Sequence, residues 1–440
     1  MENPGNITIR DENVSEILDH DIPYKLGKYE IKNELGRGTC GIVYKGYDPF
    51  VRRDVAIKVG WTEPSATSGN ESSYAQTNVF NEAYAAGKLQ HPNIVSLYDA
   101  QIEKELSYIV MEFVEGKTLL EYCRRDGKRL SAKDILESMF KCCLALNFSH
   151  QAGVIHRDIK PSNIMLTKDG ETKIMDFSVA EVSQSDAIKS EMIVGSPNYM
   201  SPEQVKCKAV GPTSDLYSLA AVMFQLFSGK TLYPRGSVKQ IFYDIVHTPP
   251  PKLIDFRPDL PPALSEIIDK ALSKNPADRY QTGKELASDL TIINDSITYN
   301  DNAIGSKESK SALLKLPFFS QFTDENLDEL MTISSILKFS TNQIISKEGD
   351  IDNSYYLIAS GNVRVRKQSQ QILVLNPGDC FGESITSHNS SRSTTLEADT
   401  NTYILKVNSV GIDTISKETQ LLFYKGFTGN LIDRLSGSRK

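Results

Sequence analysis

The chain has 440 residues, more than one ordinary domain, and its 40% hydrophobic and 24% charged residues are close to globular usage. This composition excludes a largely disordered or fibrous chain, and a net charge of −7 without a basic cluster argues against nucleic acid or an anionic membrane as a partner. Six cysteines without CxxC pairs indicate reduced thiols rather than a disulfide framework or a zinc site. No window approaches the roughly 18 apolar residues of a membrane span, so we expect a soluble, cytoplasmic protein.

Composition changes along the chain predict its domains. Residues 1–24 are polar and are expected to form a flexible leader. From Tyr29, short β-type runs alternate with glycines, and from about 133 to 290 apolar residues recur at helical spacing. Residues 295–311 are rich in Ser, Asn, Asp and Lys, which is typical of a linker. We therefore expect a first domain at 25–294, with a small β-rich lobe before a larger α-rich lobe.

The second predicted domain covers 312–440. It begins with a helical pattern at Leu313–Ile333, continues with short alternating runs separated by glycines, and ends on a helical pattern at Ser409–Leu435. This predicts a compact β structure flanked by helices. The whole chain is thus expected to be of the α+β class.

A glycine pattern opens the first domain, with Gly36, Gly38 and Gly41 followed by Val43. Dinucleotide-binding folds use a similar pattern to join a strand to a helix, whereas here a second strand follows. The pattern therefore indicates a glycine-rich hairpin over nucleotide phosphates, with an ordinary hairpin turn as the alternative.

Two charged residues downstream fit the same interpretation. Lys58 lies on a predicted strand 17 residues after Gly41, where it could hold the α and β phosphates. Glu82 opens a helical pattern and is the natural carboxylate to pair with Lys58. Taken singly, each is also explained as a solvated surface residue.

The motif His156-Arg157-Asp158-Ile159-Lys160-Pro161-Ser162-Asn163 is followed by Asp176-Phe177-Ser178. These runs resemble the catalytic loop and the magnesium-binding motif of eukaryotic-type, bacterial-like Ser/Thr protein kinases. The segment from Gly195 to Glu203 is similar to the family's P+1 loop and Ala-Pro-Glu segment, with Asp215 and Arg279 at matching positions. The resemblance spans about residues 29–290 and implies a bilobal protein kinase fold.

The resemblance also implies roles for these residues. Phosphoryl transfer depends on aligning the nucleophile and neutralising charge on the transferring group. Asp158 would orient the substrate hydroxyl and accept its proton, and Lys160 would neutralise the γ-phosphate. Asn163 and Asp176 would hold Mg²⁺. Lys160 follows the Ser/Thr pattern of the family, so the implied partners are protein substrates.

The nucleotide base can be placed by the same resemblance. Tyr108–Gly116 is similar to the strand and hinge between the lobes, with Met111 as gatekeeper, and the Glu112 carbonyl and Val114 amide would read the adenine edge. Three apolar residues match positions that sandwich the ring, although their type also suits plain core: Val43, Ala56 and Met165. ATP is the implied cofactor.

Two residues depart from the family pattern, Ser178 and, slightly, Ser201 in place of Ala, and one arginine suggests regulation. Ser178 stands where the family has glycine, and its Cβ narrows the range of backbone conformations at this position. Arg157 belongs to a kinase pattern in which a basic pocket receives a phosphorylated activation loop. The loop has no threonine, and we predict autophosphorylation at Ser190, with Ser183 or Ser185 as second choices.

The second domain contains Leu314-Lys315-Leu316-Pro317, then Glu348-Gly349-Asp350 and Leu375-Asn376-Pro377-Gly378-Asp379. These runs resemble the helical lead-in and the strand and turn pattern of cyclic-nucleotide-binding domains over about residues 312–436. Its phosphate cassette runs from Phe381 to Thr394, with Gly382 at its start, Glu383 matching the ribose ligand, and Arg392 and Ser393 at the cyclic-phosphate end. Polar residues replace the usual apolar ones after Glu383. cAMP or cGMP is therefore the implied effector, and Ser393 does not decide between them.

Two alternatives stay open. The compact β structure of the second domain, expected to be a β roll, could be a degenerate domain that serves only for interaction or dimerisation. The sequence is compatible with a homodimer. The kinase fold could also be a catalytically silent scaffold or a nucleotide-responsive binding protein. Lys58, Glu82, Asp158, Asn163 and Asp176 are all present, which favours an active enzyme.

Overall fold

A computed structural model of the chain describes residues 24–38, 41–61, 87, 89–103, 106–123, 129–177, 197–234, 236–298, 313–348, 354–367, 370–382 and 392–436. The chain divides into two compact units. The first comprises Met1–Gly87 and Ser96–Val114, and the second comprises Lys88–Val95 and Glu115–Lys440. The second unit therefore carries both the α-rich lobe and the predicted C-terminal domain.

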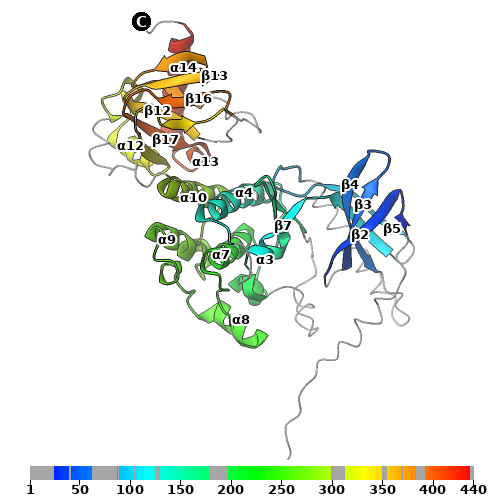
Figure 1. The fold of residues 1–440 in the computed structure, drawn as a ribbon. Coiled ribbons are helices and arrows are strands. Elements are labelled where there is room, and N and C mark those ends of the chain that lie inside the picture. Colours follow the sequence, from blue (N-terminus) through cyan, green and yellow to red (C-terminus); the bar gives the residue numbers. More distant parts are fainter. Residues whose placement is uncertain are drawn as a thin grey trace, which may run out of the picture. The chain divides into compact units, whose positions relative to one another are not determined.

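An antiparallel sheet in the order β1-β2-β3-β4-β6-β5 forms the first unit where the chain is described (Figure 1). Its strands are β1 (Lys25–Leu26), β2 (Tyr29–Gly38), β3 (Gly41–Asp48), β4 (Arg53–Trp61), β5 (Leu97–Glu103) and β6 (Leu106–Glu112). Buried and half-buried residues alternate along β3, as the period of two in a strand requires. The predicted β-rich start is confirmed.

Helices dominate the α-rich lobe of the second unit. They are α3 (Leu119–Tyr122), α4 (Ala132–Gln151), α6 (Pro202–Val205), α7 (Pro212–Ser228), α8 (Val238–His247), α9 (Pro262–Ala271) and α10 (Gly283–Thr298). Short 3₁₀ turns lie at η2 (Pro161–Asn163), η3 (Pro197–Tyr199), η4 (Leu253–Asp255) and η5 (Pro276–Asp278). A small antiparallel sheet has the order β7-β8-β9, with β7 (Gly116–Thr118), β8 (Ile164–Thr167) and β9 (Thr172–Ile174).

The two longest helices of this lobe with buried faces have clear boundaries in the sequence. Ser131 caps α4, because its hydroxyl accepts from the Asp134 amide while the Asp134 carboxylate accepts from the Ser131 amide. Pro212 stands in the first turn of α7, and Gly229 ends that helix in the left-handed conformation at φ 72°. Almost every side chain of α7 is buried, which makes it the central helix of the lobe.

Two four-stranded antiparallel sheets form the C-terminal domain, in the orders β10-β17-β12-β15 and β11-β16-β13-β14. Their strands are β10 (Ser334–Phe339), β11 (Ile344–Ser346), β12 (Ser354–Ser360), β13 (Val363–Lys367), β14 (Gln370–Leu375), β15 (Cys380–Phe381), β16 (Thr395–Ala398) and β17 (Thr402–Asn408). One apolar core draws on both sheets, including Phe339, Ile358, Val363 and Leu396. The arrangement is the predicted β roll.

Helices cover the other face of the first of these sheets. They are η6 (Pro317–Phe319), α12 (Asp324–Met331), α13 (Ser409–Ile412) and α14 (Lys417–Leu435). Phe319, Leu327, Phe423 and Phe427 from these helices share a second apolar core with Leu357 and Leu405 of the sheet. The predicted helical segments before and after the roll are confirmed, the first as a 3₁₀ turn and a short helix.

The end of α10 differs from what composition indicated. Residues 295–298, which the sequence assigned to the linker, complete this helix. Asp295, a linker residue by its type, is only 4% exposed. Its carboxylate accepts a hydrogen bond from Lys406 of β17 at 2.6 Å, which explains how a charged residue can be buried there.

Candidate active site and cyclic-nucleotide site

The predicted phosphate loop is the hairpin between β2 and β3, in which Gly36 pairs with Val43 and Gly38 with Gly41. Gly41 has φ 130°, and a Cβ there would lie 2.1 Å from the Val59 carbonyl oxygen. Only glycine fits at this position. No neighbour lies within 4 Å of a Cβ built on Gly36, so this part of the hairpin leaves space for a ligand.

The neighbouring strands carry the other predicted nucleotide residues of the first unit. Lys58 on β4 lies opposite Val43 on β3 and Ile109 on β6. Ala56 lies opposite Met111 in the same ladder, and both are buried. The sheet therefore brings the predicted phosphate lysine and the predicted gatekeeper onto adjacent strands.

Two hydrogen bonds hold the end of β6, the predicted hinge strand. The Glu112 amide donates to the Ser96 carbonyl at 2.9 Å, and the Ser96 amide donates to the Glu112 carboxylate at 3.2 Å. Val114 follows as a buried residue at the end of the first unit. Met165, predicted to contact the adenine from the other lobe, lies on β8 of the second unit, where it pairs with Thr118 and Lys173.

The catalytic-loop residues meet in the second unit. The Lys160 ammonium donates to the Asp158 carboxylate at 2.6 Å. The Asn163 side-chain amide donates to the same carboxylate at 3.0 Å and to the Asp158 carbonyl at 2.9 Å. The Asp158 side chain is 36% exposed, so an incoming hydroxyl can reach it.

The backbone that carries Asp158 is fixed by residues from distant elements. Both oxygens of the buried Asp215 carboxylate on α7 accept hydrogen bonds at 2.8 Å, one from the His156 amide and one from the Arg157 amide. Arg157 itself has φ 67°, an uncommon backbone conformation for this residue type. The Gln204 side-chain amide donates to the Arg157 carbonyl at 2.8 Å. These contacts hold the strained turn in place.

Asp176 follows directly on this framework. The His156 ring lies 2.9 Å from the Met175 carbonyl and stacks, tilted, 4.6 Å from the Phe177 ring. The Met175 amide donates to the Asn163 carbonyl at 2.9 Å. Asp176 has φ 60°, which again marks a constrained position.

Asn163 and Asp176 fit a hard divalent cation. Carboxylate and amide oxygens are the ligands that Mg²⁺ prefers, and Mg²⁺ in kinases is commonly completed by substrate phosphates and water. The Asn163 amide nitrogen donates to Asp158, so its oxygen is the atom of that side chain that can ligate a metal. The described residues contain no group of three or more His, Cys, Asp or Glu residues that would hold a metal by themselves.

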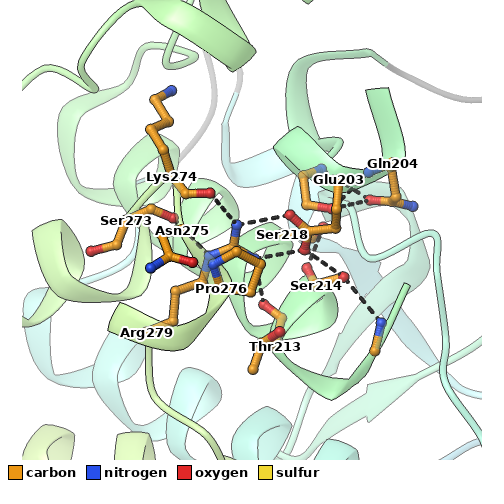
Figure 2. A network of polar contacts seen from close by, with 12 residues as sticks. Glu203, Gln204, Thr213, Ser214, Ser218, Ser273, Lys274, Asn275, Pro276 and Arg279 are labelled. Carbon is orange, nitrogen blue, oxygen red and sulfur yellow. Dashed lines mark hydrogen bonds and ion pairs between the residues drawn. The ribbon is translucent and has the colours of Figure 1, made fainter. Parts of the chain in front are cut away.

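A buried ion pair anchors the segment that follows the activation loop (Figure 2). Two Arg279 nitrogens donate to the two Glu203 carboxylate oxygens at 2.7 and 2.8 Å, and the Ser214 hydroxyl donates to the same carboxylate at 2.6 Å. Burial pushes the pKa of Glu203 upward, but the hydrogen bonds from Arg279 and Ser214 outweigh it and hold that pKa below its usual range. The pair joins α6 to the α7 start and to the turn before α10.

Several predicted residues lie outside the described residues: Glu82, Ser178, Ser183, Ser185, Ser190 and Glu383. Of the activation-segment serines, Ser201 is described, and it is fully buried as the N-cap of α6. Two functional contacts were missed from sequence, namely Gln204 and His150, whose ring lies 2.8 Å from Asp215. The placement of His150 at the end of an amphipathic helix just before the catalytic loop was the available signal.

The phosphate end of the C-terminal domain centres on Arg392. This side chain is 5% exposed, donates to the Ser354 carbonyl at 2.8 Å and lies 5.2 Å from the centre of the Tyr356 ring. Gly382 has φ 108°, and a Cβ there would lie 2.6 Å from the Ser354 oxygen and 3.3 Å from an Arg392 nitrogen. The two predicted residues therefore meet, whereas Ser393 is exposed.

Helix α14 holds the strand that leads into the cassette. The Asn430 side chain accepts from the Cys380 amide at 3.0 Å and donates to the Gly378 carbonyl at 2.6 Å. Arg434 donates to the Cys380 carbonyl at 2.8 Å. The last helix and the phosphate site are thus joined through β15.

Comparison with known proteins decides the family. The protein kinase domain family matches residues 29–290, which is more than half of the chain. The chain belongs to the protein kinase family. Residues 336–418 match the cyclic nucleotide-binding domain. The bilobal kinase and roll domains predicted from sequence are both confirmed.

Among curated relatives of this kinase is the serine/threonine-protein kinase PrkC of Bacillus subtilis, 33% identical over 66% of the chain and 44% of the relative. PknB of Mycolicibacterium smegmatis is also 33% identical, over 66% of the chain and 47% of the relative. The kinase thus matches about half the length of these relatives. A solved Mycobacterium tuberculosis PknI kinase domain is 27% identical over 61% of the chain and 96% of that domain, with a TM-score of 0.48. In the part of the kinase that the structure describes, the helices are too short or too polar to cross a bilayer.

Proposed function

We propose that the chain is an ATP-dependent protein Ser/Thr kinase whose activity is set by a cyclic nucleotide bound to its C-terminal domain. The observation that carries the enzymatic half is the contact of Lys160 and Asn163 with one Asp158 oxygen, on a backbone held by buried Asp215. These groups have the order and the chemistry that phosphoryl transfer needs. The names of the curated relatives support the same activity.

Each residue then has a defined part in the reaction. Asp158 accepts a hydrogen bond from the substrate hydroxyl and takes its proton as the new P–O bond forms and the bond from the γ-phosphorus to the bridging oxygen breaks, which releases ADP. Lys160, already 2.6 Å from Asp158, places positive charge beside the transferring phosphoryl group. Asn163 and Asp176 would hold Mg²⁺, which neutralises phosphate charge when bound.

Transfer of labelled γ-phosphate to a generic protein acceptor tests the enzymatic proposal. Asp158→Asn should slow transfer about 10²- to 10⁴-fold, because a neutral amide cannot accept the substrate proton. Asp169→Asn, in the exposed turn between β8 and β9, is the matched control and should keep full activity. Equal transfer by wild type and Asp158→Asn would instead support the scaffold alternative.

The sensor half rests on Arg392, which is buried, and on Gly382, whose lack of a side chain lets the Ser354 carbonyl and the Arg392 guanidinium come close to it. A buried guanidinium suits a cyclic phosphate, and the family match supports this ligand class. Calorimetric titration of the full chain with cAMP and then cGMP tests this. Heat with one nucleotide names the effector, whereas no heat with either nucleotide defeats the sensor proposal.

Autophosphorylation at Ser190 also remains a proposal, supported by the position of Arg157 beside the catalytic loop. Phosphopeptide mapping of active enzyme checks it, and an unmodified Ser190 would refute it. A cytoplasmic location and a homodimer likewise stay predictions.

A further inference from the structure

Helix α10 lies between the catalytic lobe and the cyclic-nucleotide domain (Figure 1). It packs against α4 of the lobe, and it also contacts α13 and β10 of the C-terminal domain. Both parts belong to one compact unit. This helix is therefore a physical connection between the two candidate sites.

The contact of α10 with the C-terminal domain includes a buried ion pair. The Lys406 ammonium of β17 donates to the Asp295 carboxylate at 2.6 Å, and the two residues are 9% and 4% exposed. Such a pair is costly to break on one side, because the remaining charge stays buried. The contact thus tends to be either made or lost, as a two-state element requires.

Close packing surrounds this ion pair. A Cβ built on Gly411 of α13 would lie 2.6 Å from the Ser288 hydroxyl of α10 and 2.8 Å from Ile333. The Asn408 side chain donates to the Ser288 carbonyl at 3.5 Å. Lys284 and Asp413 form a further ion pair at the rim, where both side chains are partly exposed.

Lys406 is also next to the phosphate site. It lies directly opposite Tyr356 in the pairing of β17 with β12. Directly opposed residues in an antiparallel pair share a face and interact. The Tyr356 ring stacks on Phe381 at 4.8 Å, and the Arg392 guanidinium lies 5.2 Å from the same ring. A ligand that moves Arg392 therefore acts on the neighbour of Lys406.

On its other side, α10 reaches the catalytic loop through α4. A Cβ on Gly283 would lie 2.3 Å from the Cys143 carbonyl, so the start of α10 sits directly on the α4 backbone. The Lys284 amide also donates to the Asn147 side chain at 3.4 Å. One turn further along α4, His150 contacts Asp215, which holds the catalytic loop.

We propose that α10 is the coupling element of this kinase, and that the Lys406–Asp295 contact transmits the state of the nucleotide site to the catalytic loop. This inference rests on the proposed cyclic-nucleotide function. Coupling requires that the nucleotide bind with unequal affinity when the contact is made and when it is lost. By linkage, the contact then changes nucleotide affinity by the same factor as the nucleotide changes the contact.

The decisive variant is Asp295→Asn in the full chain, because Asp295 lies on the kinase helix and outside the nucleotide domain. Labelled phosphate transfer is measured with and without cAMP and cGMP, and the dissociation constants of both are measured by calorimetry. We expect wild type to show a 5- to 150-fold change of activity with one nucleotide, the usual range of allosteric coupling. In Asp295→Asn this ratio should fall to near one, and the dissociation constant should shift.

Lys284→Met is the matched control, since it removes an exposed ion pair of the same interface and should keep the wild-type ratio. Gly411→Ala is a second test variant, because its methyl group separates α13 from Ser288 without changing any charge. If the urea midpoint of Asp295→Asn shows that this variant does not fold, Gly411→Ala still tests the coupling.

The outcomes separate the two proposals. No binding of either nucleotide to wild type overturns the sensor function itself. Binding without any change of wild-type activity overturns the coupling, and so does an unchanged activity ratio in Asp295→Asn or, if that variant does not fold, in Gly411→Ala. Loss of the response in the test variants, with the response kept in Lys284→Met, supports α10 as the coupling element.

Discussion

The catalytic loop and the Arg392 site are both built around charged residues, but they are held in different ways. At the catalytic loop, Asp215, Gln204 and Asn163 each bind a different backbone or side-chain atom near Asp158. Arg392 is held by the Ser354 carbonyl and the face of one ring, beside a glycine at φ 108°. The contacts described for the first site come from several elements, whereas Ser354 and Tyr356, which contact Arg392, lie on one strand, β12.

This difference explains why the two sites were unequally clear from sequence. A loop fixed by many contacts requires particular residues at many positions, and those residues form a long motif. The predicted cassette names fewer residues, and they are spread from Gly382 to Ser393, so its motif is less specific. If the catalytic site is the more rigid of the two, changes at its anchors should cost more than a change at the Arg392 site.

The largest expected effect concerns the buried Glu203–Arg279 pair beside the loop (Figure 2). Glu203→Gln leaves the Arg279 charge buried without a carboxylate, which should lower the free energy of unfolding by about 3 to 5 kcal/mol. Because folding lowers the pKa of Glu203, the stabilisation is present above its unfolded pKa and is lost as pH falls through the folded value. Urea unfolding of wild type and variant at pH 7 and at pH 3 measures both effects.

The control for that experiment is Asp259→Asn. Asp259 accepts two hydrogen bonds from Arg257 at 2.7 Å, as Glu203 does from Arg279, but its side chain is 61% exposed. The urea midpoint should therefore hardly move. An equal loss in both variants would show that burial is not the deciding factor.

Next in size is Asp215→Asn. The side-chain amide of the asparagine would place its NH₂ group against the backbone N–H of His156 or of Arg157. Two donors would then face each other, and the catalytic loop would shift. A displacement of about 1 Å costs about 100-fold in rate. Steady-state transfer assays should show this loss mainly in kcat, and an unchanged kcat would mean that the loop does not need its carboxylate anchor.

A smaller loss is expected for Arg392→Lys. Lysine keeps the charge but not the planar fork, so about one charged hydrogen bond is lost, worth about 1.5 to 3 kcal/mol. Nucleotide affinity should fall about 10- to 100-fold in calorimetry. Arg364→Lys, which changes an arginine paired with Glu397 and Asp399 elsewhere in the roll, should leave affinity as in wild type.

The smallest effect is predicted for the cap of α4. Ser131→Ala removes the hydroxyl that accepts from Asp134, at a cost of about 1 kcal/mol in unfolding free energy. Phosphate transfer at 25 °C should stay at the wild-type rate, because the other end of α4 remains tied to Asp215 by His150. If the Ser131→Ala variant were fully folded and still transferred phosphate more slowly than wild type, the catalytic loop would be less firmly held than its contacts indicate.

The residues that the sequence predicts for the catalytic loop are close together in the chain. Asp158, Lys160 and Asn163 fall within six residues, and the structure joins them directly. Gln204 and His150 were missed, since glutamine and histidine are common on helices and their role depends on partners 47 and 65 residues away. Burial is equally invisible in the sequence at Ser201, a hydroxyl of the activation segment that the structure shows as a buried helix cap.

By itself, the sequence determined the two domain types, and the catalytic groups and cassette residues that it indicates stay predictions. These are local properties, encoded in short motifs and in periodicity. Only the tertiary structure decided the extent of α10 and its contact with the roll. Asp295 looks like a linker residue in the sequence, because its partner Lys406 lies 111 residues away. In the folded protein Asp295 is buried and paired with Lys406, so it belongs to an interface, and local composition reveals neither its burial nor its pairing.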